Sequence, residues 1–366
     1  MKRLLMMTTF AALLCGCGNT KNNEAVITVG VEEFAKIMAQ NDVRLIDVRT
    51  PQEYAEGHLA GAENIDVKAA DFAERIKDIT PDREEVFGKT NGNTDGTMKM
   101  AVYCRGGKRS LQAAEQLAKQ GCTVYNLDGG ILAWQKAGKP TTTVETDIFN
   151  TNSDKLVKIH ALVHSSICIE YDGMTIYVDP VAKLQERTVD YTALPKADLI
   201  LVTHEHFDHY DSATIAMLTN ENTLLIMNHR CVELYGSGIA MGNIERLNLE
   251  NGKIPIVTIP AYNTTEGREQ FHPKGRDNGY LLYLDGLRIY IAGDTEDIPE
   301  MSDIANIVDI AFLPCNQPYT MTPEQLIRAA KIIKPKVLFP YHYGETDVSG
   351  IPAQLPGIDV RIRHYE

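Results

Sequence analysis

Basic residues are scarce in this sequence of 366 residues, and their scarcity excludes one class of function. Lysine and arginine together number 36, against 49 aspartates and glutamates, so the formal net charge is −13. A chain this acidic lacks the positive surface that follows a nucleic-acid backbone. We therefore expect no nucleic-acid partner, whereas a small-molecule substrate remains compatible with the composition.

Long apolar runs are also missing, apart from one short run at the start of the sequence. Residues 1–20, MKRLLMMTTFAALLCGCGNT, place a basic start before an apolar stretch and small residues, which is typical of a secretory signal. The apolar stretch is too short to span a membrane in the mature protein. Residues 14–17, LCGC, resemble a bacterial lipoprotein box, which implies cleavage before Cys17 and lipidation of its thiol.

This resemblance implies a division of the N-terminal residues and a location. Residues 1–17 are then a lipoprotein signal peptide, and residues 18–24 form a short polar tether. The protein is then lipid-anchored in the cell envelope, on the periplasmic or cell-surface side, with no other membrane contact. An ordinary signal peptide with two chance cysteines is the alternative.

Cysteines are few, and their spacing is not that of a disulfide framework. Five remain after the two in the signal region are set aside, and an odd number without paired spacing argues against structural disulfides. The seven cysteines stand at positions 15, 17, 104, 122, 168, 231 and 315.

The length and the pattern of apolar residues indicate two α/β domains. Residues 25–140 alternate apolar runs with helical spacing, which predicts a parallel sheet covered by helices. Residues 141–157 are polar without a clear period, and we interpret them as a linker. Residues 158–366 combine hairpin signals, such as the turn at 171–173, with β–α units, which fits two sheets flanked by helices.

The segment 102–110, VYCRGGKRS, is the first motif that indicates chemistry. An apolar strand ends at Cys104, two glycines follow, and a helix pattern begins. Inward backbone N–H groups, the helix N-terminus and the basic side chains of Arg105, Lys108 and Arg109 all favour a thiolate. We therefore predict that Cys104 is reactive rather than a buried structural thiol.

This first half resembles a rhodanese domain through three motifs: LIDVRTPQEYAEGHLAGAENI at 45–65, CRGGKRS at 104–110 and VYNLDGGILAW at 124–134. The resemblance implies that Cys104 takes sulfur from a sulfane-sulfur donor as a persulfide. It also implies an anion-facing Arg109, with Arg105 and Lys108 as substrate-binding residues. Asp47 and Arg49 resemble the structural partners of this family. The long loop near Asn91 departs from the compact pattern.

The segment THEHFDH, residues 203–209, carries the second motif. On an extended chain His204 and His206 point the same way and can reach one metal ion. If a helix begins near Phe207, Asp208 and His209 turn toward a neighbouring position. Imidazole and carboxylate groups suit zinc, manganese or iron.

Three other apolar runs end at residues of ligand type. LRIYIAGDTE leads to Asp294, KVLFPYHYGE to His342 and PIVTIPAYN to Asn263. Their recurrence beside the histidine-rich motif predicts that these strand ends meet at one metal site.

The second half resembles the metallo-β-lactamase superfamily through HEHFDH, GDT and PYHYG, and is closest to its lactonase-like and phospholipase D-like branch. The resemblance implies an αββα sandwich with Asp294 between two metals and Asp179 orienting a histidine. It places His164 near the site, whereas His160 is structural. The implied metal ligands are His204, His206, Asp208, His209, Asp294 and His342.

One ligand position departs from this pattern. Asn263 stands where the superfamily usually has a histidine, and His272 follows nine residues later. His272 either completes the first metal site or contacts the substrate; if neither residue binds, the site holds one ion. The open alternatives are therefore one or two divalent metals per chain.

These motifs predict a metal-dependent hydrolase joined to a sulfurtransferase. Zinc is the expected cofactor, with manganese or iron as alternatives. Asp208 or Asp294 can orient the attacking water and take its proton, and Asp208 is the expected catalytic residue. Two further readings stay open: a persulfide dioxygenase with one iron, and a rhodanese domain that only binds or senses. The expected substrate contacts are Asn263, Tyr262, Lys274, Tyr319 and Tyr343.

Overall fold

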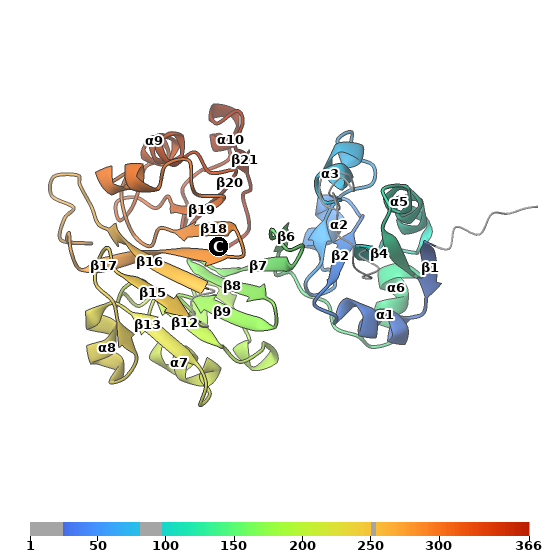
Figure 1. Ribbon diagram of the computed structural model, residues 1–366, viewed down its shortest axis with the longest axis horizontal. Coiled ribbons are helices and arrows are strands. Elements are labelled where there is room, and N and C mark those ends of the chain that lie inside the picture. Colours follow the sequence, from blue (N-terminus) through green and yellow to red (C-terminus); the bar gives the residue numbers. More distant parts are fainter. Residues whose placement is uncertain (1–24, 81–96, 250–253, 366) are drawn as a thin grey trace, which may run out of the picture.

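The computed structural model describes residues 25–80, 97–249 and 254–365. The predicted signal peptide, the tether and the lipidation site Cys17 lie outside these residues. Figure 1 shows two domains side by side, connected through the strand β6. Among the described residues, we find no helix with both the length and the apolar character needed to cross a membrane.

The N-terminal domain is built on a five-stranded sheet whose neighbouring strands all run parallel. In sheet order the strands are β1 (Val26–Val29), β5 (Thr123–Leu127), β4 (Lys99–Tyr103), β2 (Val43–Asp47) and β3 (Glu63–Asn64). The described helices are α1 (Val31–Met38), α2 (Pro51–Ala55), α3 (Phe72–Asp78), α5 (Lys108–Lys119) and α6 (Gly130–Lys136).

Both faces of this sheet are apolar, because helices cover both sides. Helices α3 and α5 pack on one face, over a cluster that includes Ile46, Val102 and Leu117. Helices α1, α2 and α6 pack on the other face, around Phe34 and Trp134. A parallel sheet requires this double cover, and the predicted parallel α/β domain is confirmed.

The C-terminal domain contains two seven-stranded sheets. The first, in sheet order, comprises β14 (Ile239–Ala240), β13 (Leu224–Met227), β12 (Leu199–Val202), β9 (Met174–Val178), β8 (Ser166–Tyr171), β7 (Leu156–Val163) and β6 (Thr146–Asn150). The second comprises β15 (Arg246–Leu249), β16 (Ile254–Ala261), β17 (Asp277–Leu284), β18 (Leu287–Ile291), β19 (Ile310–Pro314), β20 (Val337–Tyr341) and β21 (Asp359–Val360).

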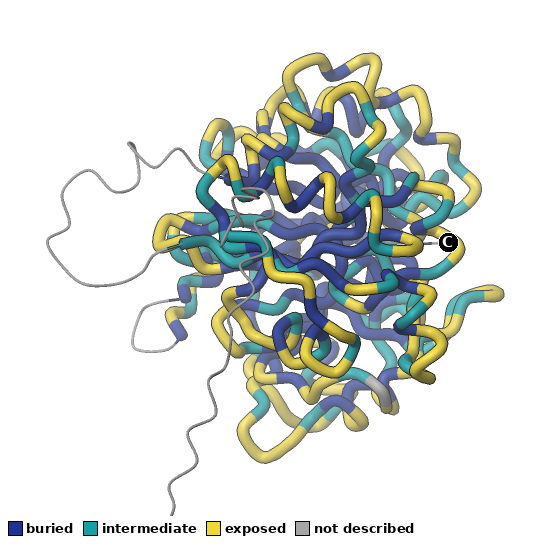
Figure 2. The backbone as a smooth tube through the Cα atoms, turned by 90° about the vertical axis from the view of Figure 1, so that its right-hand side faces the viewer, coloured by how far each residue is buried: buried dark blue, intermediate teal, exposed yellow. Residues whose placement is uncertain are grey.

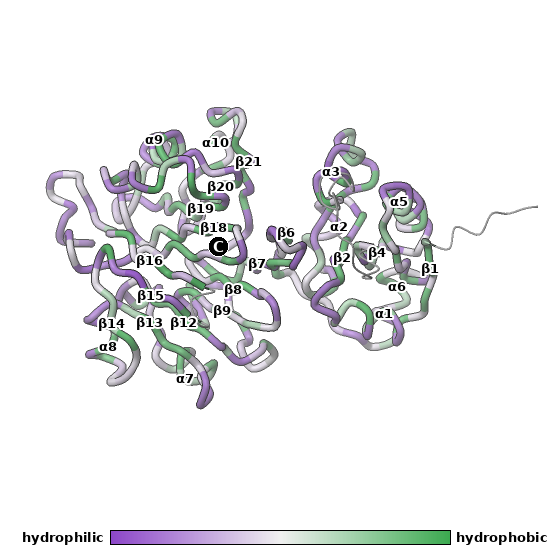
Figure 3. Tube along the Cα trace, viewed as in Figure 1, coloured by the Kyte–Doolittle hydropathy of each residue, from purple (hydrophilic) through white to green (hydrophobic). Residues whose placement is uncertain are grey.

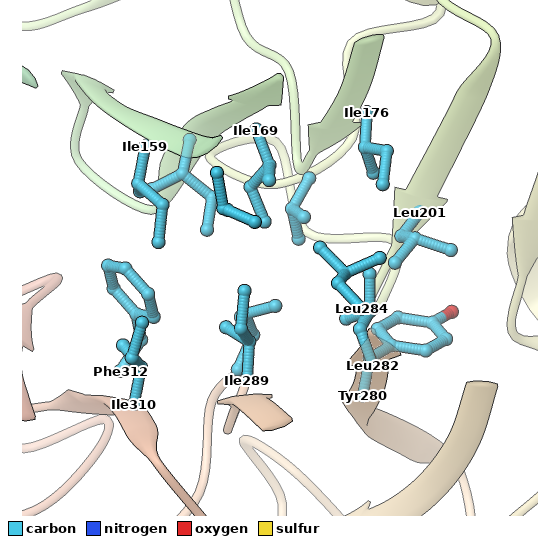
Figure 4. Close-up of a cluster of buried hydrophobic side chains, with 14 of the residues drawn as sticks. Ile159, Ile169, Ile176, Leu201, Tyr280, Leu282, Leu284, Ile289, Ile310 and Phe312 are labelled. Atoms are coloured by element: carbon cyan, nitrogen blue, oxygen red, sulfur yellow. The ribbon is translucent and has the colours of Figure 1, made fainter. Parts of the chain in front are cut away.

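The two sheets face each other across an apolar core, and helices cover their outer faces (Figures 1 and 4). Helices α9 (Pro323–Ile333) and α10 (Ile351–Gln354) lie over the second sheet, with the 3₁₀ helix Pro299–Ile304. Helices α7 (Ser212–Leu218) and α8 (His229–Tyr235) lie over the first, with the 3₁₀ helix Tyr191–Ala193. A small hairpin, β10 (Lys183–Leu184) with β11 (Arg187–Thr188), forms a separate two-stranded sheet. The predicted αββα sandwich is confirmed.

The core between the sheets follows from the alternation of side chains along each strand. Figure 4 shows side chains of the first sheet pointing toward side chains of the second. In Figure 2 the central strands are buried, and Figure 3 shows hydrophobic stretches along them with hydrophilic stretches at the periphery. The facing residues include Ile159, Ile169, Ile176 and Leu201 on one side and Tyr280, Leu282, Ile289 and Phe312 on the other.

The predicted turn at 171–173 joins β8 to β9 as a tight hairpin. Tyr171 pairs with Met174, and the two residues between them, Asp172 and Gly173, have φ angles of 50° and 82°. This left-handed backbone is what a two-residue hairpin requires, and glycine adopts it without steric cost.

The predicted linker, residues 141–157, is only partly irregular, and the prediction is wrong for its middle. Residues Thr146–Asn150 form β6, which pairs antiparallel with β7 and closes one edge of the first sheet. Strand β7 itself begins at Leu156, inside the predicted linker. Five residues with polar neighbours give little periodic signal, and the strand exists because β7 offers it a partner.

The N-terminal domain binds this edge strand through buried side chains. Arg44 donates to Glu63 at 2.6 Å and to the carbonyl oxygen of Ile148 at 2.6 Å. The backbone N–H of Thr146 donates to the hydroxyl of Tyr54 at 3.3 Å. The two domains are therefore in direct contact through β6.

Candidate functional site

Six histidines and two aspartates lie close together on turns and loops that follow strands of the two sheets. His204 follows β12, Asp294 follows β18 and His342 follows β20. His164 lies in the two-residue turn between β7 and β8, and His272 lies on the loop after β16. The structure therefore brings together residues that are up to 178 positions apart, from His164 to His342, and divides them into two groups.

The first group contains His204, His206, His272 and Asp294, each of which offers one ligand atom within 4.8 Å of the others. His206 Nδ1 lies 3.0 Å from His204 Nε2 and 3.2 Å from His272 Nε2. Asp294 Oδ2 lies 3.3 Å from His272 Nε2 and 3.9 Å from His204 Nε2.

The hydrogen bonds around the first group leave nitrogen lone pairs pointing inward. His204 Nδ1 lies 3.0 Å from Thr203 Oγ1, whose proton goes to Asp179. Nδ1 of His204 is then the protonated nitrogen, and its Nε2 carries the lone pair. Burial lowers the pKa of His204 and of His206, which favours neutral rings. Converging lone pairs repel one another unless a cation lies between them.

The spacing fits a metal ion. Four ligands arranged tetrahedrally around zinc at about 2.0–2.1 Å lie roughly 3.3 Å from one another. The separations between ligand atoms in the first group range from 3.0 to 3.9 Å and so include that value. The residues present therefore fit a divalent metal.

The second group contains His164, Asp208, His209 and His342, again within 4.8 Å of one another. Asp208 Oδ2 lies 3.3 Å from His164 Nε2 and 3.5 Å from His342 Nε2. His209 Nε2 is buried and has no hydrogen-bond partner among the described residues. A buried polar atom without a partner is costly in a folded protein, and a metal ion would satisfy it.

Asp294 lies between the two groups and offers one oxygen to each. Its Oδ2 faces the first group, whereas its Oδ1 lies 3.3 Å from His209 Nε2 and 3.3 Å from His342 Nε2. The neighbouring histidines overcome the effect of burial and hold the pKa of Asp294 well below its usual range. Its carboxylate stays ionised and offers one oxygen to each group, which is the arrangement that the predicted bridging of two metals requires.

Asp179 fixes the orientation of His209. Its Oδ2 accepts from His209 Nδ1 at 2.8 Å, which leaves Nε2 of that ring facing Asp294. Burial lowers the pKa of His209, but the carboxylates of Asp294, Asp179 and Asp208 raise it by more. The predicted orienting role of Asp179 is confirmed.

The open question at Asn263 is answered by a pair of residues rather than by one. His272 Nδ1 lies 2.8 Å from Asn263 Oδ1, and its Nε2 faces Asp294. Asn263 is buried, and its amide also donates to the Tyr319 carbonyl oxygen at 2.7 Å. His272 belongs to the first group, and Asn263 holds its ring instead of lining a substrate surface.

The predictions for His164 and for a helix near Phe207 have different outcomes. His164 was expected near the site and proves to be a member of the second group. No helix begins near Phe207, where residues 207–209 form a turn, and α7 begins at Ser212. The turn nevertheless directs Asp208 and His209 to the second group.

The predicted substrate contacts have partners of their own. Tyr262 donates to Glu300 at 2.8 Å, and the exposed Lys274 donates to Glu300 at 2.9 Å and to the Tyr262 hydroxyl at 3.0 Å. The Tyr343 hydroxyl donates to the carbonyl oxygen of Arg363 at 2.5 Å. These side chains anchor neighbouring segments in this structure.

The cysteine loop of the N-terminal domain forms a small cradle. Cys104 Sγ accepts from the N–H of Gly107 at 3.2 Å and from the hydroxyl of Ser110 at 3.4 Å. Burial raises the pKa of the Cys104 thiol, and hydrogen bonds from Ser110, Gly106 and Gly107 lower it by more, so that the pKa lies below its ordinary value. The loop thus favours a thiolate.

Arg109 faces a carboxylate rather than the open loop. Its two terminal nitrogens donate to the two oxygens of Glu53, each at 2.7 Å. The predicted anion-facing role of Arg109 therefore finds no support in this geometry. Arg105 is exposed on the loop, and Lys108 is exposed at the first residue of α5. The extended loop near Asn91 lies outside the described residues.

Of three further residues in this domain, two match their predicted roles and one was missed. Arg49 and Asp47 form a buried ion pair at 2.6 Å, and Arg49 also donates to the Gly57 carbonyl oxygen, so both are structural. Glu53 was not predicted. The motif TPQE, residues 50–53, marks Glu53 as the partner of Thr50 in a capping box at the start of α2. It does not mark Glu53 as the partner of Arg109.

Comparison with known proteins identifies both halves. A family model described as a beta-lactamase superfamily domain matches residues 158–342. A second model, described as a rhodanese-like domain, matches residues 30–137. The two matches fall on the two domains of the structure.

The relatives match the C-terminal domain. A solved structure from Parabacteroides distasonis, whose name assigns it to the metal-dependent hydrolases, is 47% identical with a TM-score of 0.58; the match covers 61% of this chain and 100% of that one. A UPF0173 metal-dependent hydrolase of Thermococcus kodakarensis is 30% identical over 197 residues, 51% of this chain and 85% of its own. One from Ignicoccus hospitalis is 31% identical over 198 residues, 51% and 82% respectively.

Proposed function

Because this chain belongs to the beta-lactamase superfamily and carries a rhodanese-like domain, we propose that it is a metal-dependent hydrolase of a small ester, lactone or phosphodiester. The observation that carries the proposal is the pair of four-residue groups that share Asp294. Two metals in such a site supply a water of lowered pKa and a positive charge for the developing oxyanion.

The residues of the chain set up this chemistry. Asp294 and the buried histidines define the two positions, and Asp179 and Asn263 hold His209 and His272 in orientation. Asp208 is the most exposed member of the second group, with 19% of its side chain accessible. We assign to it the role of accepting the proton of the attacking water.

Asp208 is suited to that role by its charge and its contacts. Burial raises its pKa, but the positive charge of His209 and the hydrogen bonds from His164 and His342 lower it by more. Its carboxylate is therefore ionised at neutral pH and can accept a hydrogen bond from a water. The lowered pKa weakens it as a base, so proton transfer to it relies on the lowered pKa that a metal-bound water would have. The partial exposure of Asp208 leaves it open to a substrate or a water.

The ligand set favours zinc. Six imidazoles and two carboxylates suit zinc better than magnesium or calcium, which prefer oxygen ligands. Manganese and iron remain compatible with the same ligands.

The first experiment measures bound metals in residues 25–366, purified without a histidine tag, and then tests hydrolysis of ester, lactone and phosphodiester substrates. We expect close to two zinc ions per chain and loss of hydrolysis in His206→Ala and Asp208→Ala. Lys99→Ala, which breaks only an exposed ion pair with Asp42, is the control. Unchanged hydrolysis in both site variants would overturn the proposal.

A second activity is favoured by the thiol cradle around Cys104. The thiolate would attack the sulfane sulfur of thiosulfate, forming the persulfide S–S bond and releasing sulfite. Cyanide would then take the outer sulfur as thiocyanate and regenerate the thiolate. Loss of thiosulfate-to-cyanide transfer in Cys104→Ser supports this activity, whereas unchanged transfer supports a binding or sensing module.

Sulfur oxidation is the remaining alternative for the metal centre. A single iron per chain, together with oxygen uptake on glutathione persulfide, would favour a persulfide dioxygenase supplied by Cys104. Absence of oxygen uptake by the iron-loaded protein rejects that alternative.

A further inference from the structure

His164 has a backbone conformation that side-chain-bearing residues rarely adopt. Its φ angle is +56°, in the left-handed region, although it is not glycine. Such a conformation persists only where the surrounding structure holds it, and it is common at functional sites. The imidazole of His164 faces Asp208 in the second metal group, at 3.3 Å.

Two backbone hydrogen bonds hold this residue in place. The N–H of His164 donates to the carbonyl oxygen of Tyr365 at 2.9 Å, and its own carbonyl oxygen accepts from the N–H of His342 at 3.3 Å. His342 belongs to the same metal group and also has a left-handed φ, of +46°. Tyr365 is thus hydrogen-bonded to the backbone of His164, which is itself hydrogen-bonded to the backbone of His342.

Tyr365 belongs to a short segment, residues 361–365, which we call the clamp segment. The ring of Tyr365 is buried in the core between the two sheets, and its centroid lies 6.4 Å from that of Tyr341. The Tyr343 hydroxyl donates to the carbonyl oxygen of Arg363, and the N–H of Tyr365 donates to the same oxygen at 3.1 Å. The segment is therefore fixed between the core and the loop after β20.

The clamp segment is also attached to β6. Arg363 binds Asp147 through two nitrogens, Nε at 2.9 Å and a terminal nitrogen at 2.7 Å, and Arg361 adds a third bond at 2.7 Å. Asp147 is buried, and the two arginines overcome burial and lower its pKa. The N–H of His364 donates to Glu145 at 2.6 Å.

Strand β6 also carries the contact with the N-terminal domain. Arg44 of that domain donates to the carbonyl oxygen of Ile148, the residue after Asp147. A continuous set of contacts therefore connects the N-terminal domain, β6, the clamp segment and His164. Among the described residues, no hydrogen bond or ion pair joins the first metal group to the clamp segment.

From this arrangement we infer that Asp147 and Arg363 are positioning residues for the second metal group, acting through the clamp segment on His164. The inference rests on the proposed function, since it requires that the group binds a metal. Removing the Arg363 guanidinium takes away two of the three bonds to Asp147 and loosens the clamp segment. We expect this to weaken metal binding at the second group and to leave the first group intact.

The test measures the two groups separately. In a His206→Ala background only the second group keeps its full ligand set, and in a His342→Ala background only the first group does. Zinc affinity is measured in each background by competition with a chromogenic chelator, with and without Arg363→Ala. Partners of metal ligands typically contribute 10- to 100-fold to affinity, so we expect a loss of roughly that size in the first background and no change in the second.

Two further variants separate positioning from general stability. Arg363→Lys keeps one ion pair with Asp147 and should recover part of the affinity. Arg288→Ala removes an arginine–aspartate pair of similar type, with Asp309 at 3.0 Å. In the described part of the chain, this pair forms no hydrogen bond or ion pair with the clamp segment. This variant should leave zinc affinity unchanged in both backgrounds.

The outcomes are distinct. A loss confined to the His206→Ala background supports the inference. An equal loss in both backgrounds shows a general folding effect and overturns it, as does unchanged affinity in both. Absence of zinc binding in the otherwise unaltered chain means that the proposed function has failed first.

Discussion

His272 Nδ1 lies 2.8 Å from Asn263 Oδ1, and this bond sets which nitrogen of the ring faces the metal centre. Asn263→Ala removes the acceptor and lets the ring turn, so we expect zinc affinity of the first group to fall roughly 10- to 100-fold. His272→Ala removes the ligand and should cost more. Chelator competition checks both variants.

The control for this pair is Lys274→Ala, on the same loop. Lys274 is exposed and contacts only Tyr262 and Glu300 among the described residues. Its loss should leave zinc affinity unchanged. Wild-type affinity in Asn263→Ala would show that the ring is held by other contacts.

A second prediction concerns the reactivity of Cys104. Iodoacetamide at neutral pH should label Cys104 before Cys168, Cys231 and Cys315, because burial raises the pKa of those three thiols, that of Cys315 to about 12. Hydrogen bonds lower the pKa of Cys104 despite its burial. Mass spectrometry of tryptic peptides gives the order of labelling.

The pH dependence of that reaction provides a sharper form of the test. The labelling rate of Cys104 should rise with pH and level off below the pH at which an ordinary thiol ionises, since only the thiolate reacts. Ser110→Ala removes one donor and should move the midpoint upward. Ser302→Ala, which removes a hydroxyl that donates only to Pro299, should not move it; equal midpoints in all three proteins would contradict the role of Ser110.

The metal site was predictable from the sequence to the extent that its ligands follow strands directly. His204, Asp294 and His342 each come just after a buried run, so a local pattern was sufficient to find them. His164 follows a strand as well, but its role depends on a hairpin turn that meets β20, 178 residues away. The sequence around position 164 contains no local pattern that predicts the contact of this turn with the end of β20.

The parts that were missed share this dependence on distant partners. Strand β6 has only five residues, and it exists because β7 pairs with it. The bond between Arg109 and Glu53 joins residues 56 positions apart. A motif identified the loop around Cys104 correctly, but it did not indicate which carboxylate would face its arginine.

A third prediction uses Trp134, which is the one tryptophan of the chain and lies buried in the N-terminal domain. Its fluorescence follows unfolding of that domain. The hydrogen bonds from Arg109 lower the pKa of Glu53 to about 2 from an ordinary value of 4.5. The ionised pair stabilises the folded domain above pH 4.5, and this contribution disappears as the pH falls toward 2.

Glu53→Gln should therefore be less stable than wild type at pH 7, by an amount that shrinks as the pH falls through this window. Urea unfolding followed by Trp134 fluorescence at several pH values gives the difference. Glu56→Gln is the control, because Glu56 ends the same helix, α2, and forms no ion pair within the described residues. A difference that stays constant from pH 7 to pH 3 would rule out the ionised pair as its source.

The last prediction concerns Arg44 and Glu63, which are buried together where the two domains meet. Removing one charge leaves the other buried without a partner, at a cost of about 3–5 kcal/mol. Arg44→Met should therefore destabilise the N-terminal domain strongly and weaken its hold on Ile148. The double variant Arg44→Met, Glu63→Leu should regain most of that stability, because apolar side chains replace both charges.

Trp134 fluorescence reports the stability of these variants, and limited proteolysis between residues 138 and 145 reports the contact between domains. Restored stability with continued cleavage would show that the bond to Ile148, rather than the ion pair, holds the domains together.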